Sequence, residues 1–138
     1  MPSKDGRKGI FMKILQNLKY TKTHEWVEFV NKTTANVGIT DYAQKELGDL
    51  VYVNLPEIGD EVIAGETFCD VESVKAVSDV LSPVTGIITE INEEIQDNPA
   101  FINEDAYNAW FVKISDISDT EDLMDADEYK AFIEEESK

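Results

Sequence analysis

The chain has 138 residues and a formal net charge of −17, and 42% of its residues are apolar. This length and composition suit one domain with a core of its own, and no apolar run approaches the ~20 residues that cross a bilayer, so no membrane role is expected. Beyond residue 22 the chain carries six basic and 28 acidic residues, a balance that disfavours nucleic-acid binding and either attracts basic partner surfaces or simply keeps the protein soluble and monomeric.

Residues 1–11 differ from the rest of the chain. They precede a second methionine, Met12, and contain Lys4, Arg7 and Lys8 but no secretory apolar stretch. We interpret them as an expression leader or a native extension, with the tail of an organellar transit peptide as the weaker alternative. One domain is predicted over 12–138.

The first part of the domain has the pattern of a hairpin followed by a helix. Residues 26–30 and 34–39 are β-prone runs separated by a short turn. Residues 41–47 are predicted to be helical, because Thr40 is a good N-cap and Gly48 a good C′ residue.

Three more β-prone runs follow the helix. Residues 50–55 form one, and residues 67–74 and 77–81 form the other two. Little more than Lys75-Ala76 separates the last two runs, so they predict a tight antiparallel hairpin.

The next segment is predicted to turn before it re-enters a sheet. Residues 83–86 read as a turn that leads into a strand over 87–91. An irregular stretch is expected from Asn98-Pro99 onward, ending at a strand over 110–114.

The C-terminal segment has the signature of a helix. Asp125 and Glu128 have capping-box spacing, and Tyr129, Phe132 and Ile133 fall on one helical face. Many short strands with one terminal helix predict a mainly β sandwich or barrel with minor helices.

Most signatures of catalysis or metal binding are absent from the sequence. It has no Gly-rich phosphate loop and no paired-cysteine metal motif, and His24 is its only histidine, so no metal site is expected. Cys69, the only cysteine, cannot form an internal disulfide. A buried structural thiol is its favoured interpretation over a nucleophile paired with His24.

Lys75 stands out by its surroundings. It is the only basic residue between Gly65 and Thr89, and Val74 and Ala76 flank it at the predicted hairpin tip. A lysine at a turn is usually only a solvated charge. Here the small, apolar neighbours leave the ammonium accessible and the tip projects it outward, which suits the attachment of a mobile acyl group.

Several motifs stand in a fixed order around this lysine. They are Lys19-Tyr20, His24-Glu25-Trp26, Val37 to Gln44, Leu47 to Val51, Leu55-Pro56, Gly59, Glu72 to Val80, Ser82 to Gly86, and Trp110. Together they resemble the H-proteins of the glycine cleavage system, and the resemblance covers about Leu18 to Glu136. It implies a lipoyl/biotinyl-type barrel-sandwich hybrid of two small antiparallel sheets, with short helices and a C-terminal helix.

The resemblance also implies roles for particular residues. Lys75 would carry lipoate in amide linkage, and Glu72 and Gly86 match positions that the lipoate-attaching enzyme recognises. Turn geometry is the structural alternative for Gly86. Glu25 and Asp79 match residues that line a cleft for the loaded arm, where a carboxylate would face its ammonium and exclusion of water would protect it. The alternative for these two is an ordinary surface carboxylate.

A protein of this family is a carrier and not an enzyme. The resemblance implies that it shuttles an aminomethyl group between glycine decarboxylase (P-protein), aminomethyltransferase (T-protein) and dihydrolipoyl dehydrogenase (L-protein). It implies a bacterial cytoplasm, or the mitochondrial matrix in a eukaryote. One departure is Glu46, which stands where some relatives have histidine, so details of arm release do not carry over.

Four other functions could in principle use a lysine at a hairpin tip. A biotin domain normally has methionines beside its lysine, and a lipoyl domain of a 2-oxoacid dehydrogenase usually has Asp before it and flexible linkers; neither pattern is present. A Schiff-base enzyme needs a lysine with a depressed pKa, whereas Glu72 and Asp79 favour the charged form. An H-like protein that relays lipoyl groups to other lipoyl domains shares every residue named here and stays open.

Overall fold

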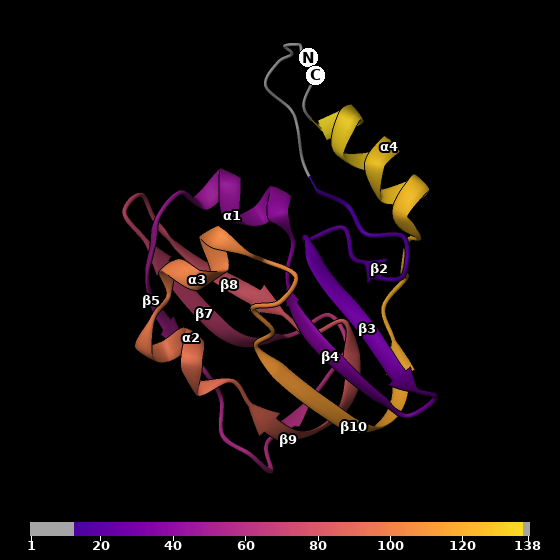
Figure 1. Ribbon diagram of the computed structural model, residues 1–138. Coiled ribbons are helices and arrows are strands. Elements are labelled where there is room, and N and C mark those ends of the chain that lie inside the picture. The colour runs from indigo at the N-terminus through magenta and orange to yellow at the C-terminus, as the bar shows by residue number, and fades with distance from the viewer. Residues whose placement is uncertain (1–12, 137–138) are drawn as a thin grey trace.

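Two antiparallel sheets and short helices make up the computed structural model, which describes residues 13–136 (Figure 1). The larger sheet has six strands in the order β2-β3-β4-β10-β9-β6, and the smaller has three in the order β5-β7-β8. The strands are β2 Lys19–Tyr20, β3 Glu25–Asn31, β4 Thr34–Ile39, β5 Leu50–Asn54, β6 Glu61–Val62, β7 Thr67–Ser73, β8 Val77–Leu81, β9 Val84–Ile91 and β10 Val112–Thr120. The helices are α1 Asp41–Leu47, α2 Glu93–Asp97, α3 Ala100–Glu104 and α4 Ala126–Glu136.

The main core lies between the two sheets. Val37 and Ile114 of the larger sheet and Val53, Val71 and Val80 of the smaller one are buried in a single cluster. Successive side chains of a strand point to opposite faces, so each strand needs apolar residues only at alternate positions to supply this core. The predicted mainly β fold of two small sheets is confirmed.

The locally encoded elements are confirmed. β3 pairs with β4 and β7 with β8, both antiparallel. Helix α1 begins where predicted, because Thr40 Oγ1 accepts a hydrogen bond from Ala43 N at 3.1 Å, and it ends at Gly48, whose φ is 80°. No helix within 13–136 combines the length and apolar character of a membrane span.

The prediction of an irregular stretch from Asn98-Pro99 onward is wrong over residues 100–104, which form helix α3, and a further helix, α2, lies directly before this stretch. The segment from residue 92 to 105 contains the two helices α2 and α3, which cover one side of the strands (Figure 1). Each helix has only five residues, too few for a helical period to show in the sequence. They are held instead by fully buried Ile95 and Ile102, and by Asn92, whose side chain accepts from Glu94 N.

The prediction of a turn at residues 83–86 is also wrong, because strand β9 begins at Val84 and includes Gly86. Gly86 pairs with Val62 of β6. A Cβ at Gly86 would lie 2.6 Å from both Ile114 Cγ2 and the Ser115 carbonyl oxygen. Glycine is required here for the close approach of β10, whose register shifts directly after Ser115.

The C-terminal helix packs as expected. The capping box is present, since Asp125 N and Glu128 N each donate to the other's side chain at 2.9 Å. The Tyr129 ring stacks on Tyr20 with centroids 4.5 Å apart, and Ile133 is buried in the same cluster. His24, whose φ is 74°, joins the sheet to this helix through the Tyr129 hydroxyl at 2.8 Å.

We expect Gly86→Ala to lower the free energy of unfolding by about 1–3 kcal/mol, because the added methyl overlaps Ile114 and the β10 backbone. Urea unfolding checks this. Glu90→Ala, a change on the exposed part of the same strand, is the matched control, because its ion pair with Lys113 at 3.3 Å is exposed and such pairs contribute about 0–1 kcal/mol. Equal stability of Gly86→Ala and wild type would contradict the packing argument.

Candidate functional site

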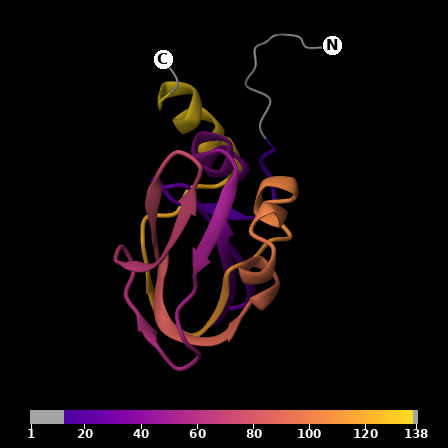
Figure 2. The same cartoon turned by 90° about the vertical axis from the view of Figure 1, so that its left-hand side faces the viewer.

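The hairpin tip between β7 and β8 is closed by Ser73. Its backbone N–H donates to the Ala76 carbonyl at 2.8 Å, and its hydroxyl oxygen accepts from Lys75 N and Ala76 N at 3.1 Å each. Val74 N also donates to the Asp49 carbonyl at 3.0 Å. The tip is therefore fixed to the loop between α1 and β5, and the views in Figures 1 and 2 agree that the hairpin ends beside α1.

Lys75 lies exposed on this tip, with its side chain over the end of α1. Its ammonium donates to the Glu46 carbonyl oxygen at 3.1 Å, one of the carbonyls that a helix C-terminus leaves without a partner inside the helix. Gly48 lies directly below, where a Cβ would be 3.2 Å from Lys75 Cε. The contact with Glu46 is to the backbone, so it does not depend on the carboxylate at this position.

Asn103 of α3 holds the loop beneath Lys75, a role that no local sequence pattern indicates. Its Nδ2 donates to Gln44 Oε1 and to the Gly48 carbonyl, both at 2.9 Å, while its Oδ1 accepts from Leu50 N at 2.9 Å. One side chain thus joins the end of α1 to the start of β5. Only the α3 helix, which was not predicted, brings Asn103 to this loop.

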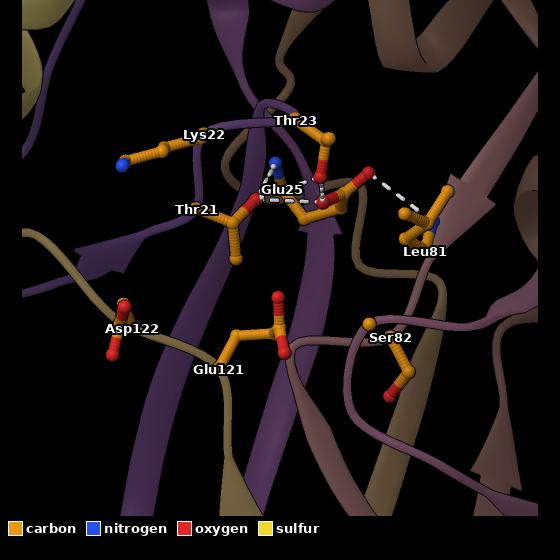
Figure 3. A pocket seen from close by; sticks show the side chains of 9 residues that line it. Thr21, Lys22, Thr23, Glu25, Leu81, Ser82, Glu121 and Asp122 are labelled. Atoms are coloured by element: carbon orange, nitrogen blue, oxygen red, sulfur yellow. Dashed lines mark hydrogen bonds between the residues drawn. The ribbon is translucent and has the colours of Figure 1, made fainter.

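Glu25, at the start of β3, is buried with only 2% of its surface exposed. Its Oε1 accepts from the Thr21 hydroxyl at 2.6 Å and the Thr23 hydroxyl at 2.5 Å, and its Oε2 accepts from Leu81 N at 3.2 Å (Figure 3). The last bond joins the larger sheet to β8 of the smaller one. Glu25 is therefore not an ordinary surface carboxylate.

A pocket of about 260 Å³ adjoins this carboxylate. Its lining residues are Thr21, Lys22, Thr23, Glu25, Gly65, Leu81, Ser82, Glu121 and Asp122. The Glu121 carboxylate extends into the same space, whereas Lys22 points away from Glu25 (Figure 3). Negative and hydroxyl oxygens thus dominate the pocket wall near Glu25, a surface suited to a cationic group.

Asp79 lies on the exposed face of β8, opposite Asp70 of β7. It is not among the residues that line the pocket. However, β8 runs from the Lys75 hairpin past Asp79 to Leu81, whose N–H is bound by Glu25. The structure thus brings both candidate cleft residues to one strand, one buried with its hydrogen bonds made and the other open to solvent.

The other residues singled out from the sequence have different surroundings. Glu72 is half-buried on β7, between Tyr52 and Val77 in the register, whereas Gly86 is buried in the other sheet. The prediction that Cys69 is a buried thiol is confirmed, and burial raises the pKa of this thiol. Within residues 13–136 no group of three or more His, Cys, Asp or Glu side chains is arranged to hold a metal ion.

Burial raises the pKa of the Glu25 carboxyl above its ordinary value of 4.5, and the hydrogen bonds from Thr21, Thr23 and Leu81 only partly oppose it. A raised pKa means that the folded state holds this proton more tightly than the unfolded state does. The stabilisation is complete below the ordinary pKa and is lost as the pH rises through the folded-state pKa.

We expect the stability difference between wild type and Glu25→Gln to shrink as the pH rises from the ordinary Glu value, because only wild type loses this contribution. The variant should still lose about 1–3 kcal/mol, because its amide has one acceptor oxygen where the carboxylate has two and cannot accept from both Leu81 N and the threonine hydroxyls. Urea unfolding of both proteins between about pH 4.5 and 8 measures the difference, and all other carboxylates are common to the two. A difference that does not change with pH would contradict the assigned pKa direction.

The comparisons with known proteins agree with one another. The family model described as glycine cleavage H-protein matches residues 18–136. The glycine cleavage system H protein of Lachnoclostridium phytofermentans is 60% identical over 125 residues, which cover 91% of this chain and 98% of that protein. The probable H protein of Pyrococcus abyssi is 53% identical over 124 residues, covering 88% and 92%. The crystal structure of the H protein from Mycobacterium marinum matches with a TM-score of 0.80 at 40% identity, covering 86% of this chain and 97% of that one. The chain belongs to the glycine cleavage H-protein family.

Proposed function

We propose that Lys75 carries lipoate in amide linkage and that the chain thereby serves as the lipoyl carrier of glycine cleavage. The observation that carries this proposal is the position of Lys75, exposed at the tip of a hairpin that is itself fixed to the body. Among residues 13–136, its ammonium donates a hydrogen bond to the backbone carbonyl of Glu46 and forms no ion pair. A lysine held this weakly is free to be acylated.

The surroundings of Lys75 fit a long flexible group better than a catalytic lysine. A Schiff-base enzyme activates its lysine by burial or by a neighbouring cation. Lys75 is exposed, and it is the only Lys or Arg between Lys45 and Lys113. The same exposure leaves room for an arm that leaves the surface and returns, and no observation favours a relay of lipoyl groups to other proteins over this role.

When attached, the lipoyl group supplies a dithiolane that accepts the aminomethyl group and electrons. The chain's own residues orient and shelter it. Asp79 places a carboxylate on the exposed side of β8, and Glu25, fixed by three hydrogen bonds, forms part of the pocket at the end of that strand. We assign these two residues to the resting place of the arm, where they hold an ammonium and the pocket wall excludes water.

Partners follow from the same proposal. Glycine decarboxylase, aminomethyltransferase and dihydrolipoyl dehydrogenase would each meet the arm of a monomeric carrier, in the cytoplasm of an organism like its bacterial and archaeal relatives. The lipoate-attaching enzyme would contact Glu72 directly, because this residue is partly exposed next to the hairpin. Gly86 is buried against β10, so its part in recognition would come through the position of the backbone.

We expect incubation with purified lipoate–protein ligase, lipoate and ATP to add one lipoyl group to the chain, at Lys75 alone. Intact mass and peptide mapping make the measurement. Lys75→Arg should accept none, while Lys45→Arg, which removes an exposed lysine of the neighbouring helix, should accept as wild type does. Lipoate mapped to another lysine, or a modified Lys75→Arg variant, would refute the assignment.

A second expectation concerns the arm's resting place. Asp79→Asn should speed the loss of ammonia from the loaded carrier by roughly two- to fivefold, because an exposed charge contact contributes up to about 1 kcal/mol. High salt should reduce the advantage of wild type. Ammonia release is measured with no transferase present, and Asp97→Asn, the same change at an exposed residue of α2, is the control. Identical rates of ammonia release from all three proteins would show that Asp79 does not protect the loaded arm.

A further inference from the structure

The pocket beside Glu25 is closed by segments from distant parts of the chain. Gly65 N, in the turn between β6 and β7, donates to the Ser82 carbonyl at 2.7 Å. Glu121 N, directly after β10, donates to the Pro83 carbonyl at 2.8 Å. Both bonds end on the short connection between β8 and β9, so this connection fixes the two segments that face Glu25.

The side chain of Glu121 points into the space in front of Glu25 (Figure 3). Its carboxylate lies against the backbone of Gly65, where a Cβ would be 2.9 Å from Glu121 Oε2. Gly65 has a φ of 86°, which glycine adopts without strain, and its missing side chain leaves the room that this carboxylate occupies. Within residues 13–136 the Glu121 carboxylate makes no ion pair, so its charge is available to a bound cation.

Glu25 by itself offers an ammonium little capacity for hydrogen bonds. A carboxylate has about four lone-pair sites, and an alkylammonium has three N–H donors. Bonds from Thr21, Thr23 and Leu81 N already occupy most of the sites on Glu25. Burial also raises the pKa of the Glu25 carboxyl, because its charged form is unfavourable in this position. An ammonium in the pocket therefore needs a second acceptor.

Asp79, the other carboxylate assigned to the resting place of the arm, does not line the pocket. It lies on the exposed face of β8, before the strand reaches Leu81. Glu121 does line the pocket, and Lys22, the cationic residue of the wall, points away from Glu25 (Figure 3). The pocket itself thus pairs Glu25 with Glu121.

We propose that Glu121 is the second carboxylate that binds the carried ammonium, an inference that rests on the proposed function. The extended arm has roughly 14 to 16 bonds between Lys75 Cα and the carried nitrogen, depending on the loaded sulfur, and spans about 18–20 Å. The strand from Lys75 to Leu81 covers at most about 20 Å. The end of the arm therefore reaches the pocket, where Glu121 meets it from the side opposite Glu25.

The first test needs no lipoyl group. Methylammonium chloride is titrated into the unmodified chain at constant ionic strength, with sodium chloride as the balancing salt, and the amide NMR shifts of Gly65 and Leu81 are followed. We expect saturable shifts in wild type. Glu121→Gln should raise the dissociation constant about two- to fivefold, because it keeps the size of the side chain and removes an exposed charge.

Two further variants separate loss of charge from loss of structure. Glu121→Asp retains the charge, so its dissociation constant should stay within about twofold of wild type. Glu57→Gln, the same change at an exposed residue outside the pocket, should bind methylammonium as wild type does. Thermal unfolding of each variant establishes that it is folded. Added salt should weaken binding more in wild type than in Glu121→Gln.

The second test uses the lipoylated chain, loaded with the aminomethyl group by glycine decarboxylase and glycine. Loading should shift the Gly65 amide signal in wild type and shift it less in Glu121→Gln, whose loaded form should release ammonia about two- to fivefold faster. Equal methylammonium binding by wild type and folded Glu121→Gln, or no saturable shift at Gly65 in wild type, overturns the assignment of Glu121. A wild-type chain that accepts no lipoate overturns the proposed function instead, whatever the methylammonium titration gives.

Discussion

The buried carboxylate of Glu25 joins the two sheets at the point where the site is built. Its two oxygens accept three hydrogen bonds, one of them from Leu81 N of the smaller sheet and the others from the loop that precedes β3. A buried carboxylate without such partners would be strongly unfavourable. The position of β8, and with it that of Asp79 and the pocket, therefore depends on this one side chain.

The other end of the smaller sheet is held by hydrogen bonds to the end of α1 and the loop that follows it. Asn103 joins α1 to β5, and Val74 N and the Lys75 ammonium bind carbonyls of the same region. Most of these bonds involve the backbone, so the hairpin is fixed from below while its outer face stays open. A carrier benefits from this arrangement, because the base of a swinging arm is defined in position and only the arm has to move.

Charge and exposed apolar surface act together at the hairpin. An acidic surface favours partners with basic faces over a range that salt limits, but long-range attraction by itself does not set an orientation. A bulge in β5 adds Val51 and Tyr52 to the surface beside Lys75.

The sequence by itself determined the features that depend on neighbours along the chain. Turn-forming residues and the spacing of apolar residues over a few positions determine three features. These are the capping of α1 and α4, the two hairpins and the exposed position of Lys75. Its order of motifs also identified the family.

The tertiary structure alone decided the burial of Glu25, the part played by Asn103, the close contact at Gly86 and the outward turn of Val51. Each of these depends on a partner that is distant in the chain or on the register of another strand, for example Leu81, which is 56 residues from Glu25. No local pattern records such a contact, because it arises only when the two sheets pack together.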